Sequence, residues 1–349
     1  MTNFSYATND PSALTREWEA LLRDFRALGG VAENVVLGKG SFGLGLFPRD
    51  ATKPFLLRLP DNLLFPIENV EFVQDRIRVR DSAGIAPAER DFFERYESIF
   101  SWGGGGGAES ARFISMLDSL PPEVRTKLIN NYRMRDVLEG DQTKRTQTRF
   151  LKSRMIYWND RYVLIPLIDL ANCGTDGTFY SGDSEGHLQI EGEARGEILV
   201  DYGPHDSLSI FHFFGFPAAR PRAYSLPMRT KIGRRSLKIG WNLAAKRMRA
   251  NISVPEMKLE DGEIFLSHLV IGNANGPRLP RGIFCALMKE AGATGADEAF
   301  DRIALINKRA FLDLLGALEP YHGEMIAMLR ATAHFQLQSM TQCIGTRDL

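Results

Sequence analysis

Residues 162–216 decide the fold, and they read YVLIPLIDLANCGTDGTFYSGDSEGHLQIEGEARGEILVDYGPHDSLSIFHFFGF. The stretch opens with an apolar segment, 162–167, which predicts a short buried strand ahead of the polar residues 169–173. A second apolar segment ends in Asp201, Tyr202 and Gly203, before an aromatic run closes at Phe216. Two polar clusters therefore follow two predicted strands, which is where small folds commonly place binding chemistry.

The composition favours a soluble globular protein of ordinary charge. The 349 residues allow two domains, and 44% of them are hydrophobic. The 43 basic and 43 acidic side chains cancel, which disfavours nucleic acid as a partner. We expect neither an export signal nor a membrane span, because the first residues are polar and no run of 18 apolar residues follows.

The cysteines predict a reduced, cytoplasmic protein without a structural zinc ion. Cys173, Cys285 and Cys343 are odd in number, and no CxxC or Cys/His cluster has metal-binding spacing. We therefore expect no metal in the site.

The spacing of apolar residues predicts the order of the remaining elements. A helix is predicted to begin at Pro11, and short strands are predicted at 55–59 and 63–67. A helical insertion is predicted at about 86–150, with a flexible loop at the five glycines 103–107. Beyond residue 221 the predicted strands and then helices lie at 229–243, 264–271, 283–288, 303–318 and 325–340.

Two patterns leave alternatives open. Residues 35–50, VVLGKGSFGLGLFPRD, match GxGxxG and resemble a kinase glycine-rich loop. A Rossmann helix does not follow and VAIK, HRD and DFG are missing, so a glycine-rich hairpin is favoured, or one that lets backbone amides approach a ligand. The basic run 229–249 is a solvated face or a contact patch for an acidic partner.

Four motifs, in order, give the chain a resemblance to the SET-domain methyltransferases, in the branch typified by the Rubisco large-subunit lysine methyltransferase. They are GLGL at 43–46, resembling GxG; Ser153-Arg154; PLIDLANC at 166–173, resembling PxxDxxNH; and GE at 196–197 with VDYG at 200–203 and FGF at 214–216, resembling GE…NYG and YGF. The resemblance covers roughly residues 12–217. Here Cys173 replaces the family's histidine, and Phe214 replaces a tyrosine.

The resemblance implies an α+β fold: small SET-type β-sheets with a helical insertion, then a mainly helical C-terminal domain with some strands. A SET-like catalytic domain would span 1–220, and a domain resembling a substrate-binding domain would span 221–349. It further implies S-adenosylmethionine as the cofactor.

By the same resemblance, each site residue has an expected role. Cofactor-binding residues would be Phe42, Gly43, Leu44, Arg154, Asn172, Cys173 and Phe214. Substrate-binding residues would be Ser153, Asp169, Ala171, Val200 and Phe216. Tyr202 would be the catalytic tyrosine.

The chemistry of methyl transfer gives these roles a physical reason. Transfer from a sulfonium needs a neutral nucleophile aligned behind the methyl group. A lysine amine must therefore be held in its free form, and a tyrosine hydroxyl with carbonyl oxygens can orient it. The guanidinium of Arg154 can pair with the cofactor's carboxylate. The residues alone also allow Tyr202 as a packed aromatic, Arg154 as a surface ion-pair residue and Asp169 as a turn cap.

The predicted function is N-methylation of a lysine, or else a histidine, of a protein bound partly by residues 221–349. One alternative is a SET-fold methyltransferase that acts on a small molecule. Another is a SET-fold binding protein without turnover.

Overall fold

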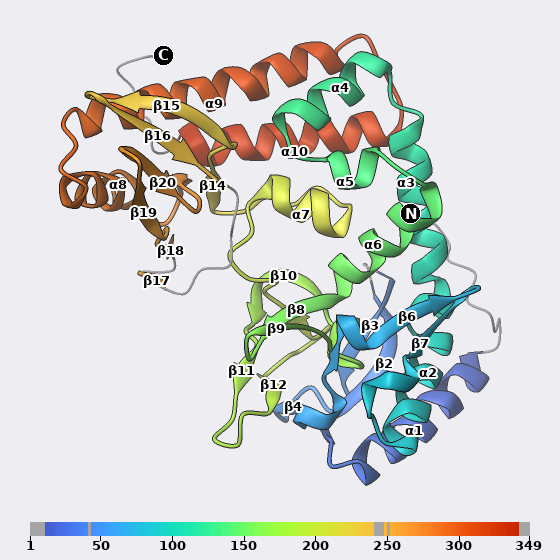
Figure 1. The fold of residues 1–349 in the computed structure, drawn as a ribbon. Helices are drawn as coiled ribbons and strands as arrows, with labels where there is room; N and C mark the ends of the chain where they lie inside the picture. Colours follow the sequence, from blue (N-terminus) through green and yellow to red (C-terminus); the bar gives the residue numbers. More distant parts are fainter. Residues whose placement is uncertain (1–10, 41–42, 241–247, 250–251, 342–349) are drawn as a thin grey trace. The chain divides into compact units, whose positions relative to one another are not determined.

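The computed structural model describes residues 11–40, 43–240, 248–249 and 252–341. The chain forms two compact units. Unit 1 comprises Met1–Phe113 and Asp141–Gly203, and unit 2 comprises Ile114–Gly140 and Pro204–Leu349. Figure 1 labels the elements of both units, and each is described here by itself.

The strands of unit 1 form several small sheets. A four-stranded sheet has the order β1 (Val31–Glu33), β4 (Phe55–Leu59), β12 (Leu188–Gly192) and β11 (Ser181–Gly182). A three-stranded sheet has the order β5 (Phe65–Pro66), β9 (Arg161–Leu164) and β8 (Met155–Trp158). The paired strands are β2 (Val35–Gly40) with β3 (Gly43–Pro48), β6 (Val70–Val73) with β7 (Arg76–Val79), and β10 (Asn172–Thr178) with β13 (Leu199–Val200).

The helices of unit 1 bury the apolar side chains that recur at helical spacing. They are α1 (Pro11–Ala27), α2 (Pro87–Ile99), α6 (Gln142–Arg154) and the first part of α3 (Gly107–Asp118). Trp18, Leu21, Leu22 and Phe25 of α1 are buried in the core. In β4 the alternate residues Phe55, Leu57 and Leu59 are buried, as a strand with one core face requires.

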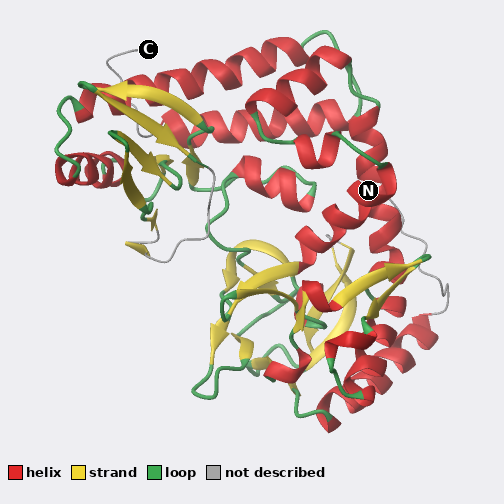
Figure 2. Ribbon diagram, in the orientation of Figure 1, coloured by secondary structure: helices red, strands yellow, loops and turns green. Residues whose placement is uncertain are grey.

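Unit 2 is mainly helical and carries a group of short strands, as Figure 2 shows. Its helices are the end of α3, α4 (Pro122–Asn131), α5 (Arg135–Leu138), α7 (Ser207–Phe214), α8 (Leu279–Glu290), α9 (Ala296–Leu318) and α10 (Glu324–Thr341). Its strands are β14 (Arg222–Tyr224), β15 (Met228–Ile232), β16 (Arg235–Ile239), β17 (Met248–Arg249), β18 (Ile252–Ser253), β19 (Met257–Glu260), β20 (Glu263–Leu266) and β21 (Val270–Asn273). The largest sheet among them has the order β15-β16-β20-β19.

A buried carboxylate joins three elements of unit 2. Asp206 caps α7, where its Oδ1 accepts hydrogen bonds from the amide and the hydroxyl of Ser209 at 2.8 and 2.6 Å. Its Oδ2 accepts the amide of Tyr224 in β14 at 3.0 Å and Nε2 of Gln336 in α10 at 2.5 Å. Since the side chain has no exposed surface, these bonds replace its hydration.

The predicted α+β class is confirmed, and so are the first helix, the glycine-rich hairpin and the three C-terminal helices. The predicted strand at 162–167 is shorter than expected, because β9 ends at Leu164 and Leu167 has a positive φ of 70°. Among the described helices, none has the length and apolar character needed to cross a membrane.

Candidate functional site

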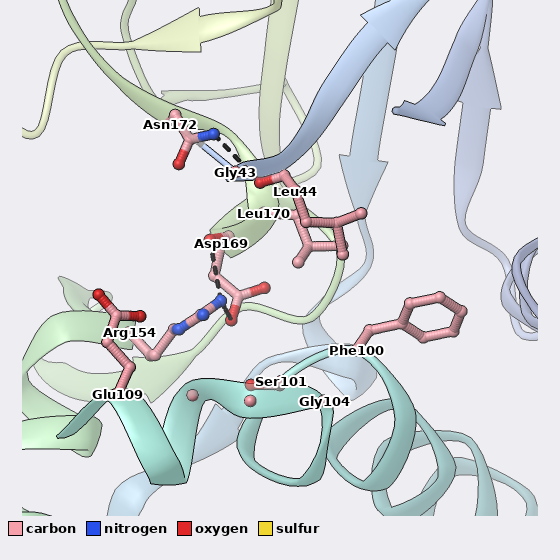
Figure 3. A pocket seen from close by; sticks show the side chains of 12 residues that line it. Gly43, Leu44, Phe100, Ser101, Gly104, Glu109, Arg154, Asp169, Leu170 and Asn172 are labelled. Carbon is pink, nitrogen blue, oxygen red and sulfur yellow. Dashed lines mark hydrogen bonds and ion pairs between the residues drawn. The ribbon is translucent and has the colours of Figure 1, made fainter. Parts of the chain in front are cut away.

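A pocket in unit 1 collects residues from four separated segments of the sequence. Its empty space is about 540 Å3, part of it open to solvent. Figure 3 shows the labelled lining residues. They come from the hairpin (Gly43, Leu44), the glycine-rich segment (Phe100, Ser101, Gly104, Gly105, Gly106, Glu109), the end of α6 (Arg154) and the segment between β9 and β10 (Asp169, Leu170, Asn172).

Arg154 is the cation of this pocket, and it stands at the C-terminal end of α6. Its Nη1 donates to the backbone oxygen and to Oδ2 of Asp169, both at 3.1 Å. Nε and Nη2 have no hydrogen-bond partner among the described residues. Burial lowers the pKa of Arg154, but the nearby Asp169 carboxylate raises it, and the pKa lies above its usual value. Arg154 is therefore a permanent charge with donors left for a ligand.

Residues of α2 contact the ion pair between Arg154 and Asp169 on its buried side. The Tyr96 hydroxyl donates to Asp169 Oδ1, and the Tyr96 side chain is fully buried. The neighbouring Glu97 is also buried and accepts the amide of Trp102 at 3.4 Å. Burial and the charge of Asp169 raise the pKa of Glu97 to about 8. Buried polar side chains therefore surround the carboxylate that pairs with Arg154.

The glycine run at 103–107 is part of the pocket wall, so the predicted flexible loop is wrong. Trp102–Gly106 forms a wide helical turn that leads into α3. A side chain on Gly103 would collide with the backbone oxygen of Ser98, and Gly105 has a φ of 121°. Gly103 is therefore needed because the backbone packs too closely for a Cβ atom, and Gly105 because of its backbone conformation.

Glycine is required at positions 43 and 45 of the hairpin for two different physical reasons. Gly43 has a φ of 101°, which only glycine adopts without strain. At Gly45 a Cβ atom would collide with Glu197 Oε1 and approach Asn172 Nδ2 to 2.9 Å. Asn172 Nδ2 donates to that Glu197 oxygen at 2.5 Å and to the backbone oxygen of Leu44 at 3.1 Å. Asn172 and Glu197 therefore fix the hairpin against the pocket.

Tyr202 lies at the end of unit 1 with its hydroxyl directed at the main chain. It donates to the backbone oxygen of Ala171 at 3.2 Å. Burial, with the adjoining Cys173 thiol, raises the pKa of Tyr202 above its usual value. The hydroxyl therefore remains protonated at neutral pH. Tyr202 is not among the lining residues of the pocket.

The remaining predicted site residues lie on α6, in the strand pair β10 and β13, and in unit 2. Ser153 lies on α6, and its hydroxyl donates to the Phe150 carbonyl at 2.8 Å. Cys173 in β10 pairs with the buried Val200 in β13. Phe214 and Phe216 belong to unit 2, with their rings 6.4 Å apart.

Phe42 lies outside the described residues. The predicted roles of all these residues stay predictions.

Sequence reasoning missed four residues that shape the site. Tyr96 falls within the predicted helical insertion and has no predicted site role, and the acidic neighbour Glu97 on the same helix face is the signal that a buried polar group lies there. Glu109 lies two residues after the glycine run, and Glu197 is part of the GE motif. Their contacts span up to 73 residues, which no local pattern reveals.

One acidic cluster outside the pocket has the composition of a metal site. Asp183, Glu185 and His187 place one ligand atom each within 4.8 Å of one another. Asp183 Oδ1 already accepts the amides of Glu185 and His187, and Oδ2 meets His187 Nδ1 at 3.0 Å and Arg58 at 3.3 Å. The carboxylate of Asp183 therefore serves as a turn cap and an ion-pair partner.

Comparison with known proteins finds a curated relative and several solved structures that are similar to this chain. No protein-family model matches the chain. A protein of Aquifex aeolicus (strain VF5) described as uncharacterized is 33% identical over 110 residues, which are 30% of this chain and 89% of that protein. The chain therefore belongs to the same family as that protein, whose description gives no activity.

Two of the similar structures are of LSMT, the Rubisco large-subunit lysine methyltransferase, which typifies the branch that the four motifs resemble. The SET domain of LSMT bound to lysine and AdoHcy is 12% identical, with 96% of this chain and 90% of that chain covered and a TM-score of 0.44. Rubisco LSMT bound to sinefungin and monomethyllysine is also 12% identical, with 95% and 90% covered and a TM-score of 0.46.

Proposed function

We propose that this chain is a cytoplasmic N-methyltransferase that uses S-adenosylmethionine to methylate a lysine side chain of a protein. One observation carries the proposal. Four residues expected from three separate motifs to bind one cofactor all line the same pocket: Gly43, Leu44, Arg154 and Asn172.

The residues of the pocket fit the parts of this cofactor. The methionine part ends in a carboxylate, and Arg154 has two donor nitrogens without described partners to meet it. The hairpin at Gly43 and Leu44 brings polar backbone to the pocket without bulk on the glycine. Asn172, with Cys173 next to it, would lie along the adenine. The ion pair with the buried Asp169 carboxylate holds the Arg154 guanidinium in position before a ligand binds.

When bound, the cofactor supplies a methyl group on a positively charged sulfur. The chain's own residues must hold the acceptor amine neutral and aligned. By the resemblance, the Tyr202 hydroxyl, which donates to the Ala171 carbonyl, would orient the acceptor amine. The backbone oxygens of Asp169 and Ala171 are acceptors of the same kind. Residues 221–349 would contribute to holding the protein substrate.

Tyr202→Phe tests the proposal because it removes one oxygen and keeps the ring. With tritiated S-adenosylmethionine and a whole-protein extract, we expect the wild type to label proteins and hydrolysis to release methyl-lysine. The variant should turn over about a hundredfold to a thousandfold more slowly, with little change in cofactor affinity.

Three outcomes would contradict the proposal in different ways. Unaltered transfer by Tyr202→Phe would remove the catalytic role of that hydroxyl. Label found only in dialysable molecules would identify a small-molecule methyltransferase. Cofactor binding without any transfer would identify a binding protein.

A further inference from the structure

The pocket of unit 1 has three formally charged lining side chains: Arg154, Asp169 and Glu109. Arg154 and Asp169 form an ion pair at 3.1 Å, in which the side chain of Asp169 is only 5% exposed. Two opposite charges so close together largely cancel for a ligand further away. Among the described lining residues, Glu109 is the charged side chain outside that ion pair, and its charge also acts on the buried Arg149, which does not line the pocket.

Glu109 is placed where its charge can act on a ligand. It stands in the first turn of α3, directly after the glycine turn, and Figure 3 shows it beside Arg154. It makes no hydrogen bond or ion pair with another described residue. Its charge still reaches neighbouring groups: burial lowers the pKa of Arg149 to about 10, and Glu109 opposes that shift.

We propose that Glu109 is a specificity-determining residue that makes the pocket prefer cationic S-adenosylmethionine to neutral S-adenosylhomocysteine. The inference rests on the proposed function and adds how the site distinguishes the substrate from the product of the same reaction.

The reaction changes the net charge of the cofactor, and Glu109 distinguishes substrate from product by this charge. The S–CH3 bond breaks with its electron pair left on sulfur, a new N–CH3 bond forms, and the acceptor nitrogen releases a proton. The cofactor enters with a net charge of about +1, since its sulfonium adds to a zwitterionic methionine part, and it leaves with none. The Glu109 carboxylate attracts the first species more strongly than the second. The product is thereby released more easily.

The size of the effect follows from exposure. Glu109 is exposed, so water and salt screen it, and exposed charge pairs contribute up to about 1 kcal/mol. We therefore expect a discrimination of about 1.4- to fivefold from this residue.

The test is the ratio of two dissociation constants, S-adenosylhomocysteine over S-adenosylmethionine, measured by calorimetry. Glu109→Gln should lower this ratio about 1.4- to fivefold, and Glu109→Asp should largely keep it. Glu68→Gln is the matched control, because Glu68 is an exposed glutamate of unit 1 that does not line the pocket. Sinefungin, which carries an ammonium group in place of the sulfonium, should follow S-adenosylmethionine.

A measurement on the unmodified protein gives a second readout. Raising the salt from about 0.01 M to about 1 M shortens the Debye length from about 30 to about 3 Å, so the wild-type ratio should fall toward that of Glu109→Gln. An unchanged ratio in Glu109→Gln, or a salt-independent ratio in the wild type, overturns the role of Glu109 and leaves the proposed function intact. A wild type that binds neither ligand overturns both.

Discussion

Asp169 in unit 1 and Asp206 in unit 2 are two buried carboxylates with different surroundings. Burial raises the pKa of both. Asp206 is satisfied by neutral donors from α7, β14 and α10. Asp169 instead faces the cation Arg154 and the Tyr96 hydroxyl, and it borders an open pocket.

The difference separates a structural carboxylate from one that prepares a binding site. Neutral donors on every side leave Asp206 nothing to offer a ligand, so its bonds hold three elements together. Asp169 fixes one nitrogen of Arg154 and leaves others available. Removing the Asp206 carboxylate should therefore damage the fold. Changes around Asp169 should alter stability less and ligand binding more.

The largest expected effect is on the fold. Asp206→Ala removes the cap of α7 and leaves the amides of Ser209 and Tyr224 buried without an acceptor. We expect the free energy of unfolding to fall by about 3–5 kcal/mol, measured by urea denaturation. Asp206→Asn, which keeps one acceptor oxygen, should lose less. Equal stability of Asp206→Ala and the wild type would show that the network is not structural.

A smaller effect is expected behind the pocket. Tyr96→Phe removes one donor to Asp169 and leaves the ring packed against Phe100. Because Arg154 still pairs with the carboxylate, the loss in unfolding free energy should be about 1–2 kcal/mol. The same denaturation experiment measures it, and a loss as large as that of Asp206→Ala would mean that the two carboxylates are held alike.

An effect of a different kind depends on pH. Glu97 has its pKa raised to about 8 in the folded protein, so between its unfolded value of 4.5 and 8 the folded state binds a proton that the unfolded state lacks. Its contribution to stability is therefore complete below pH 4.5 and is lost as the pH rises, at up to about 1.4 kcal/mol per pH unit. Between pH 5.5 and 8, Glu97→Gln should lose less stability than the wild type. Parallel curves would place the Glu97 pKa near its ordinary value.

Local patterns predicted the elements well and the site only in part. The spacing of Trp18, Leu21 and Phe25 marks a helix face, because each helix buries one stripe of side chains. The glycine run at 103–107 was misassigned, because its requirement arises from backbone contact with residue 98 rather than from its own sequence. The contact between Tyr96 and Asp169 depends on tertiary packing, which the sequence does not display locally.

Calorimetric titration with S-adenosylmethionine tests most directly the proposal that Arg154 binds the carboxylate of this cofactor. Arg154→Ala should bind about ten- to a hundredfold more weakly than the wild type, because a charge-assisted pair contributes about 1.5–3 kcal/mol. Arg161→Ala is the matched control, since Arg161 pairs with Asp61 outside the pocket, and it should bind like the wild type. Equal affinity of Arg154→Ala and the wild type, in folded protein, would contradict the account.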